Sequence, residues 1–153
     1  MHELANIQNI SLWGRSMGAV TALLFCNLHD LNKRVSGIVL DSPFSSLKKL
    51  AKEHIDSKSP LPNITTNYIY SFIRKKILKK AKFDMDKISP IANLDSIKIP
   101  GFFITSKNDK IVSMNHVKKL YKKYKGDKCI VVTKQGHNSF RPDEVMKDTI
   151  NFI

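Results

Sequence analysis

Four short apolar runs recur along the chain, and polar or turn-forming residues bound each of them. Short apolar runs rich in β-branched residues are typical of buried strands. The pattern predicts strands over residues 7–13, 35–40, 99–104 and 128–133.

Between these runs, apolar positions recur every three or four residues, which is the period of an α-helix. The repeat predicts helices over residues 17–28, 47–55, 66–81, 113–125 and 141–153, with a proline-containing loop over 57–63. The expected inner stripes are Met17, Val20, Leu24 and Leu28, then Ile69, Phe72, Ile73 and Ile77, then Val117, Leu120 and Tyr124, and last Val145, Met146, Ile150 and Ile153.

The alternation of strands and helices defines the expected fold class. Strands separated by helices form a parallel sheet with helices on its faces, joined by right-handed crossovers. The 153 residues, 42% of them hydrophobic, suffice for one domain with a core. We therefore predict an α/β fold with about four parallel strands and helices on both faces.

The charge is strongly positive, with a formal net charge of +13 at pH 7. Such a charge attracts anionic surfaces. Most of the basic residues are lysines spread along the chain, whereas readers of nucleic acid rely on arginine and on basic patches interleaved with aromatics. We expect no specific nucleic-acid partner.

Other patterns are missing from the sequence. Cys26 and Cys129 lie in apolar runs, which predicts no disulfide framework and favours a reducing compartment. No histidine or cysteine cluster has metal-ligand spacing, so no metal or cofactor is expected. No apolar run is long enough to span a membrane, and no signal peptide is apparent, so a cytoplasmic location is predicted.

The most informative local pattern is Gly-Arg-Ser-Met-Gly at residues 14–18, directly between a predicted strand and a predicted helix. In that context Gly-x-Ser-x-Gly indicates a nucleophile elbow, with Ser16 on a tight strand-to-helix turn. The crowded turn accounts for Gly14 and Gly18. The N–H of Met17, at the helix N-terminus, would face a developing oxyanion.

A serine nucleophile needs a base and a group that orients the base. His137 follows the last predicted strand and is the expected base. Asp109 follows the third strand and is the expected acid, with Asp41, at the end of the second strand, as the rival. The chain order Ser16, Asp109, His137 is that of the α/β-hydrolases.

With these residues, the chain resembles the α/β-hydrolase superfamily and, more narrowly, its serine-aminopeptidase-like branch, which includes esterases and depalmitoylases. The stretches at 14–19, 40–45, 79–84 and 137–142 resemble an uncharacterised plant and protist subgroup. The resemblance implies Ser16 as nucleophile, Asp109 as acid, His137 as base and Met17 N–H as an oxyanion donor.

The resemblance also implies an arrangement of the domain. The elbow and the next strand occupy residues 7–43, a helical lid or cap falls within 44–98, and the acid and histidine lie in 99–153. Residues 44–88 match the place of the family's lid; the alternative is two ordinary packing helices.

The family's sheet has more strands, and the elbow normally follows several of them. The chain therefore resembles the C-terminal half of a hydrolase, and the edge of the first strand is left open to pairing. Two functions follow. One is a serine hydrolase of an acylated or other small-molecule substrate. The other is a truncated, non-catalytic fragment that binds a partner, or self-associates through this sheet edge.

A basic stretch at residues 68–80 offers a further interaction. It would lie on an anionic membrane surface, which makes the protein peripheral to the membrane, or it would form the solvated face of a packed helix.

Overall fold

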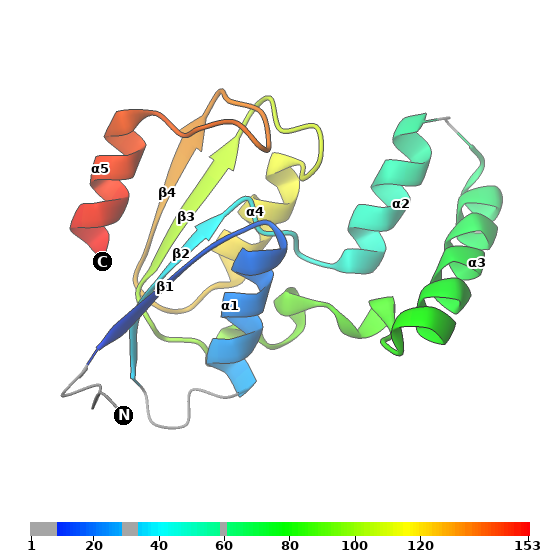
Figure 1. The fold of residues 1–153 in the computed structure, drawn as a ribbon, viewed down its shortest axis with the longest axis horizontal. Coiled ribbons are helices and arrows are strands. Elements are labelled where there is room, and N and C mark those ends of the chain that lie inside the picture. The colour runs from blue at the N-terminus through cyan, green and yellow to red at the C-terminus, as the bar shows by residue number, and fades with distance from the viewer. Residues whose placement is uncertain (1–8, 29–33, 59–60) are drawn as a thin grey trace, which may run out of the picture.

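The computed structural model describes residues 9–28, 34–58 and 61–153. Over these residues, four parallel strands form one sheet in the order β1-β2-β3-β4 (Figure 1). The strands are β1 (Ile10–Arg15), β2 (Val35–Asp41), β3 (Gly101–Ser106) and β4 (Lys128–Thr133). Within this part of the chain β1 pairs only with β2, so its other edge is open.

Helices cover both faces of the sheet, as the alternation of elements predicted (Figure 1). The helices are α1 (Met17–Leu28), α2 (Leu47–Lys58), α3 (Asn63–Ala81), α4 (Met114–Lys123) and α5 (Asp143–Phe152), with short 3-10 helices η1 (Met85–Lys87) and η2 (Pro90–Ser96).

The alternation of side chains along β2 and β3 divides the core into two layers. Ile38, Leu40 and Phe103 pack with α1 and α4 in one cluster. Val39, Phe102 and Ile104 pack with α5 in another. Because successive strand residues point to opposite faces, one apolar run serves both layers.

The α2–α3 hairpin projects from the sheet as a separate arm (Figure 1). Polar contacts tie α3 to the segment that leads back to the sheet. Arg74 on α3 donates two hydrogen bonds to Asp84, at 2.7 and 2.5 Å, and Tyr70 donates one to Asp86 at 2.5 Å. The described helices include none that is long and apolar enough to cross a bilayer.

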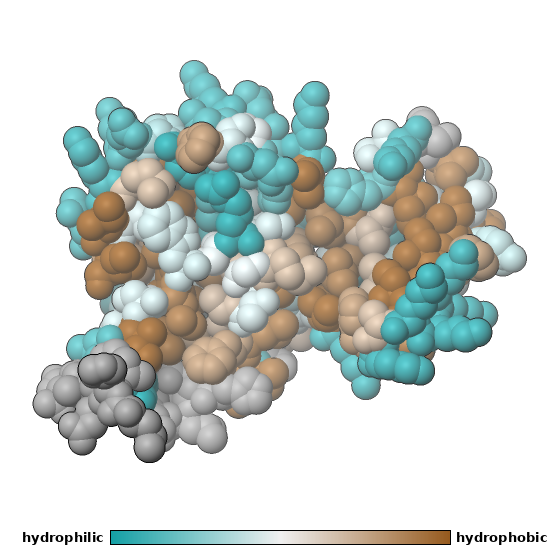
Figure 2. All heavy atoms as spheres, in the orientation of Figure 1, coloured by the Kyte–Doolittle hydropathy of each residue, from teal (hydrophilic) through white to brown (hydrophobic). Residues whose placement is uncertain are grey.

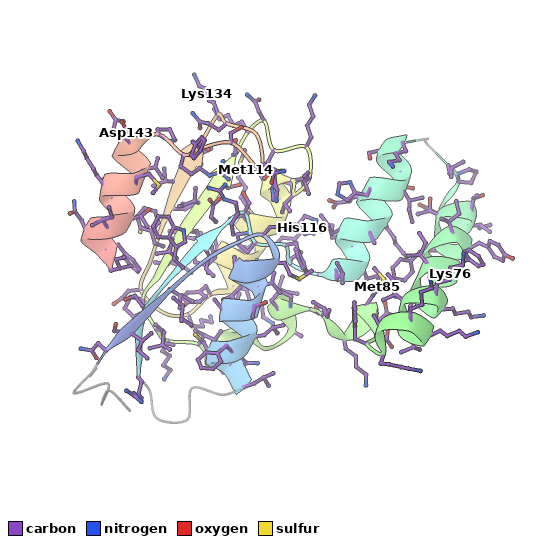
Figure 3. All side chains as sticks on the ribbon, in the orientation of Figure 1. Lys76, Met85, Met114, His116, Lys134 and Asp143 are labelled. Atoms are coloured by element: carbon purple, nitrogen blue, oxygen red, sulfur yellow. The ribbon has the colours of Figure 1, made fainter. Side chains whose placement is uncertain are left out.

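A buried histidine joins this arm to the sheet. His116 of α4 accepts hydrogen bonds at Nδ1 from the Ser45 backbone N–H, at 3.2 Å, and lies 2.8 Å from the Ser45 hydroxyl. Its Nε2 is 2.9 Å from Glu53 on α2 (Figure 3). An Nδ1 that accepts from a backbone N–H must be unprotonated, so the proton lies on Nε2 and is donated to Glu53.

The predicted element types are confirmed, and the boundaries shift by a few residues. Residues 7–8 of the first predicted strand lie outside the described residues. β3 begins and ends two residues later than predicted, and α3 begins at Asn63, within the predicted loop. Short 3-10 helices occupy much of 84–96, of which 84–93 reads as irregular from the sequence.

The predicted helix faces are right for α4 and wrong in part elsewhere. Val117, Leu120 and Tyr124 are buried, as expected. The other expected stripes include residues that are exposed, namely Met17, Leu28, Phe72, Ile150 and Ile153. In α1 the small residues Ala19 and Ala22 face the sheet instead, because the helix lies close against it.

The His116 contacts predict a pH dependence of stability. Burial lowers the pKa of His116 below its ordinary value and outweighs the opposing effect of Glu53. In the unfolded chain this histidine takes up a proton that the folded state excludes, so the free energy of unfolding should fall as pH drops below about 6.5. Urea titrations at several pH values should show a flatter dependence for His116→Gln. The control His54→Gln, on a half-buried histidine of α2, separates the effect of the buried site from the loss of one histidine side chain.

Candidate active site

At the carboxyl edge of the sheet, the first residue after each of β1, β2 and β3 adds one more backbone hydrogen bond to the neighbouring strand. Ser16 N–H donates to the Asp41 carbonyl at 2.7 Å, and Ser42 N–H donates to the Ile104 carbonyl at 2.9 Å. Lys107 N–H donates to the Thr133 carbonyl at 2.9 Å. These bonds hold the first residues of three loops in register, at the edge where open α/β sheets place their functional groups.

Ser16 lies in the left-handed region, with φ 51°, between the end of β1 and the start of α1. This conformation is uncommon for a residue other than glycine, and strained residues of this kind cluster at functional sites. A Cβ on Gly14 would lie 2.3 Å from the Gly18 backbone, so a side chain there cannot fit. The same expectation for Gly18 is wrong, because a Cβ there would meet nothing within 4 Å.

The residue after Ser16 begins helix α1. Backbone N–H groups in the first turn have no acceptor within the helix, and the helix dipole makes this end partly positive. The Met17 N–H is therefore a suitable donor for an anion beside Ser16.

Asp109 lies in the loop after β3, where both oxygens of its carboxylate have hydrogen-bond partners. Oδ1 accepts hydrogen bonds from the backbone N–H groups of Ile111 and Val112, at 2.9 and 2.8 Å. Burial raises the pKa of Asp109, but the hydrogen bonds from His137, Val112 and Ile111 outweigh it and hold the pKa below its ordinary value. Asp109 is therefore an ionised acceptor at neutral pH.

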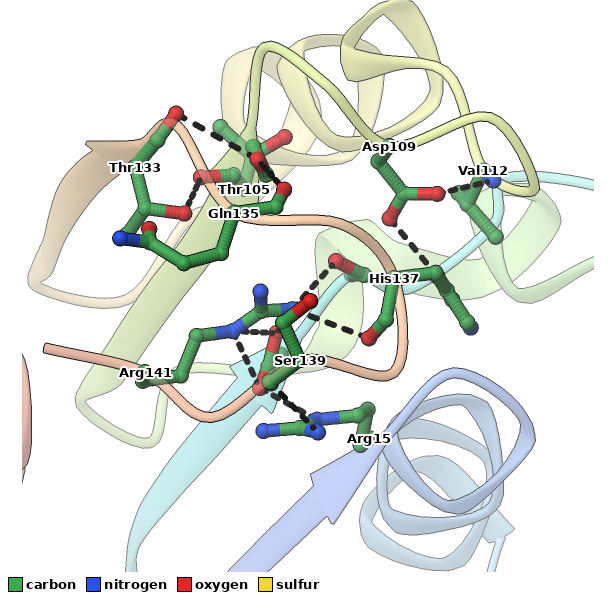
Figure 4. Close-up of polar contacts among 12 residues, drawn as sticks. Arg15, Thr105, Asp109, Val112, Thr133, Gln135, His137, Ser139 and Arg141 are labelled. Atoms are coloured by element: carbon green, nitrogen blue, oxygen red, sulfur yellow. Dashed lines mark hydrogen bonds and ion pairs between the residues drawn. The ribbon is translucent and has the colours of Figure 1, made fainter.

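The second carboxylate oxygen contacts the histidine predicted as the base. His137 Nδ1 is 2.7 Å from Asp109 Oδ2 (Figure 4). Since the ionised carboxylate can only accept, Nδ1 carries the proton and Nε2 is left as a free acceptor in the neutral ring.

The loop that carries His137 is anchored to the Asp109 loop by main-chain carbonyls. Ser106 donates its hydroxyl proton to the Gln135 carbonyl. Asn108 donates its side-chain amide to the Lys134 carbonyl at 2.6 Å. The two loops are thus held together directly before the Asp109–His137 pair.

Asp41, the rival acid, has different partners. Its carboxylate is fully buried and accepts from Arg15 Nε at 2.7 Å, from Arg141 Nε at 3.0 Å and from Arg141 Nη2 at 2.7 Å. Its contacts within the described residues include no histidine. Asp41 thus compensates two arginines at this edge and does not orient His137.

The two arginines also bind the backbone of the histidine loop (Figure 4). Arg141 Nη1 donates to the Gly136 carbonyl at 3.1 Å, and Nη2 lies 3.5 Å from the His137 carbonyl. Arg15 Nη1 donates to the Ser139 carbonyl at 3.4 Å. Arg15, which precedes Ser16, and Arg141, which binds the His137 loop, therefore both bind the buried carboxylate of Asp41.

The sequence analysis assigned no role to Arg141, and it gave Arg15 only as part of the Gly-Arg-Ser-Met-Gly pattern. A compositional signal was present, because only four of the 26 basic residues are arginines. Arg15, Arg74 and Arg141 each bind carboxylate oxygens through their forked guanidinium groups. A lysine-rich chain that retains arginine at a few positions indicates sites where a planar donor is needed.

The structure brings Asp109 and His137 into contact and places Ser16 at the same sheet edge. No hydrogen bond joins the side chains of Ser16 and His137 among the described residues. Bonds of this kind are often long without substrate. The described residues also include no group of three or more histidine, cysteine or acidic side chains that would hold a metal ion.

A parallel α/β sheet with a strained serine between strand and helix, and a histidine–aspartate pair at the same edge, is the arrangement of an α/β-hydrolase. The chain belongs to the serine hydrolase family, which it matches over residues 2–141.

The chain is also similar to individual known proteins. The chain is 28% identical over 130 residues to the uncharacterized protein YqkD of Bacillus subtilis (strain 168). The matched segment covers 85% of this chain and 41% of that protein. Its fold is similar to that of the Pyrococcus furiosus esterase Pf2001, with a TM-score of 0.65 and 23% identity, over 95% of this chain and 52% of that chain.

The acetyl xylan esterase 1 of Thermoanaerobacterium sp. JW/SL YS485 is also similar, with a TM-score of 0.65 and 18% identity, over 96% of this chain and 45% of that chain. At these identities the solved structures show the fold. The chain spans about half the length of these three relatives.

The Asp41 contacts predict that Arg141 is important for stability. Removing one partner from a buried, hydrogen-bonded ion pair costs about 3–5 kcal/mol. Since Arg15 still compensates Asp41, we expect Arg141→Met to lower the free energy of unfolding by about 3 kcal/mol in urea titrations. The control Arg74→Met removes a partly exposed pair on the arm and should cost much less. Equal losses in the two variants would contradict a special role for the buried pair.

Proposed function

We propose that this protein is a serine hydrolase that cleaves an ester, thioester or amide through an acyl-enzyme on Ser16. The observation that carries the proposal is the 2.7 Å contact between His137 Nδ1 and Asp109 Oδ2, at the sheet edge that also holds the strained Ser16. Three residue types in these roles form the hydrolytic triad of the family.

The proposed reaction begins with transfer of the Ser16 hydroxyl proton to His137 Nε2 while Oγ bonds to the substrate carbonyl carbon. The carbonyl oxygen becomes an oxyanion that accepts from Met17 N–H. On collapse, the bond to the leaving group breaks and the leaving group takes the proton from His137. Water then attacks the acyl-enzyme, gives its proton to His137, and the acid product leaves as Ser16 regains a proton.

The surface beside the elbow favours an acylated substrate. A depression of about 650 Å³ is lined by Trp13, Phe140 and Met146, together with Arg15, Arg141 and Asp143. Since both arginines bind Asp41, the side chains left to contact a substrate are the three apolar ones and Asp143. A mainly apolar lining suits an acyl chain and so supports a carboxylic ester or thioester, the kind of substrate that the resemblance to the serine-aminopeptidase-like branch implies.

A second candidate function is sheet completion by another chain. The open edge of β1 and the adjacent part of α1 form an apolar groove of about 290 Å³, which includes Leu12, Trp13 and Phe25. Trp13 and Phe25 are exposed there. A second copy that pairs at β1 would cover them. Sedimentation that shows a concentration-dependent dimer, lost in Trp13→Lys, would support this function over a monomeric hydrolase.

The hydrolase proposal predicts labelling by a fluorophosphonate probe, which reacts with an activated serine. The wild-type chain should be labelled, Ser16→Ala should lose all labelling, and the control Ser71→Ala, on an exposed serine of α3, should keep it. If the 153-residue chain is unlabelled but a version extended upstream is labelled, upstream residues, such as a second oxyanion donor, are needed for activity. Labelling that survives in Ser16→Ala would rule out Ser16 as the nucleophile.

A second comparison distinguishes the roles of the Asp109 and Asp41 carboxylates. Asp109→Asn should leave the fold intact and slow hydrolysis of a p-nitrophenyl ester on the order of 10³–10⁴-fold, because the amide no longer fixes the Nδ1–H tautomer of His137. Asp41→Asn should act mainly on stability, since it weakens the contacts of Arg15 and Arg141. Urea titration and initial rates on both variants measure the two effects. A larger kcat loss in Asp41→Asn at equal folded fraction would reverse the assignment.

A further inference from the structure

The outward face of helix α3 carries an exposed apolar stripe. Ile64, Tyr68 and Phe72 are 83%, 77% and 56% exposed, respectively. They follow one another at intervals of four residues, so they lie in one row along the first half of the helix. Figure 2 shows hydrophobic side chains gathered over α2 and α3.

The second half of α3 and its C-cap carry the positive charge. The lysines there are all exposed: Lys75, Lys76, Lys79, Lys80 and Lys82. Residues 63–83 contain no aspartate or glutamate. None of the five lysines forms an ion pair with a described residue, whereas Lys76 Nζ lies 4.6 Å from the centre of the Phe72 ring. Figure 3 shows the long side chains that project from this end of α3, with Lys76 labelled.

The opposite face of the same helix is already packed. Thr66 and Tyr70 are buried, and Arg74 is bound by Asp84. The outward stripe is therefore not the side that closes the arm. Because the arm projects from the sheet, this face is also presented away from the rest of the molecule (Figure 1).

We propose that the outward face of α3 binds an anionic lipid bilayer, with the helix lying in the plane of the interface. Ile64 and Phe72 would insert between the headgroups, and Tyr68 has the apolar ring and polar tip that favour this depth. The lysines one and two turns further on would contact acidic headgroups.

The charges and side chains of this face favour an anionic bilayer as its partner over a nucleic acid or a protein groove. The cations of the face are lysines, which act as point charges toward a diffuse anionic surface, and Arg74, the arginine of α3, is bound by Asp84. An apolar row beside unpaired lysines matches a bilayer, which offers both hydrocarbon and negative charge to one side of a helix. The binding does not involve Ser16, so it is independent of the hydrolase proposal.

The test is co-sedimentation of the full 153-residue chain with vesicles of phosphatidylcholine alone or mixed with phosphatidylserine. We expect binding to the mixed vesicles, weakened by added salt, and little binding to phosphatidylcholine alone. The triple variant Lys75→Gln, Lys79→Gln, Lys80→Gln should bind about a hundredfold more weakly, at about fivefold for each lysine. Replacing Ile64, Tyr68 and Phe72 with Gln should cost about tenfold or more.

Matched variants keep the test specific. The variant Lys118→Gln, Lys122→Gln, Lys125→Gln removes the same charge from exposed positions on and after α4 and should bind as the wild type does. Ser16→Ala should also bind normally, whether or not it retains fluorophosphonate labelling. Circular dichroism establishes that each variant is folded.

Four results would overturn the proposal. The first is no binding to mixed vesicles, and the second is equal binding to both vesicle types. The third is an equal loss in the α4 lysine variant, which would make the attraction a property of net charge. The fourth is a stripe variant that changes the oligomeric state and leaves vesicle binding unchanged, which would assign the face to protein contacts.

Discussion

The candidate site depends on one buried carboxylate, that of Asp41. It accepts from two arginines, and these same arginines donate to the backbone of the loop that carries His137. Its main-chain carbonyl accepts from Ser16 N–H. A buried charge of this kind is tolerated only when it is compensated and fully hydrogen-bonded, and charge-assisted bonds are stronger than neutral ones. The position of the serine turn and the position of the histidine loop are therefore coupled through the buried carboxylate of Asp41.

This coupling accounts for how the chain holds a strained residue. A non-glycine residue at φ 51° costs on the order of 1–3 kcal/mol and persists only where its surroundings determine it. Ser16 is constrained by its bond to Asp41 and by the close approach of Gly14 to Gly18. On the other side of the site, Asp109 is oriented by two backbone N–H groups before it meets the histidine. The candidate residues are thus held by main-chain contacts and ion pairs, so the sheet edge determines their geometry.

The arm formed by α2 and α3 differs from the sheet in its exposed apolar surface and in the partners of its charged side chains. Its attachment combines an apolar cluster, in which Leu50 of α2 packs with Val20 of α1, with polar contacts such as those of His116. Its outer face leaves apolar side chains in solvent. The basic residues behind the net charge of +13 also differ in their partners. At the sheet edge two arginines are bound by a buried carboxylate, whereas on α3 the lysines have no acidic partner among the described residues. The first arrangement stabilises a site, and the second leaves charge available to an external surface.

Local sequence determined the element types, the parallel α/β class and the serine turn, because periodicity and turn chemistry are properties of neighbouring residues. It also placed Asp109 and His137 after successive strands, and parallel strands bring such loops to one edge. The partners of Asp41 could not be predicted, since Arg141 lies a hundred residues away in the chain. Nor could the outward face of α3, where Phe72 fits the helical period but points to solvent. Periodicity gives a helix two faces, and only packing against other elements decides which face is buried.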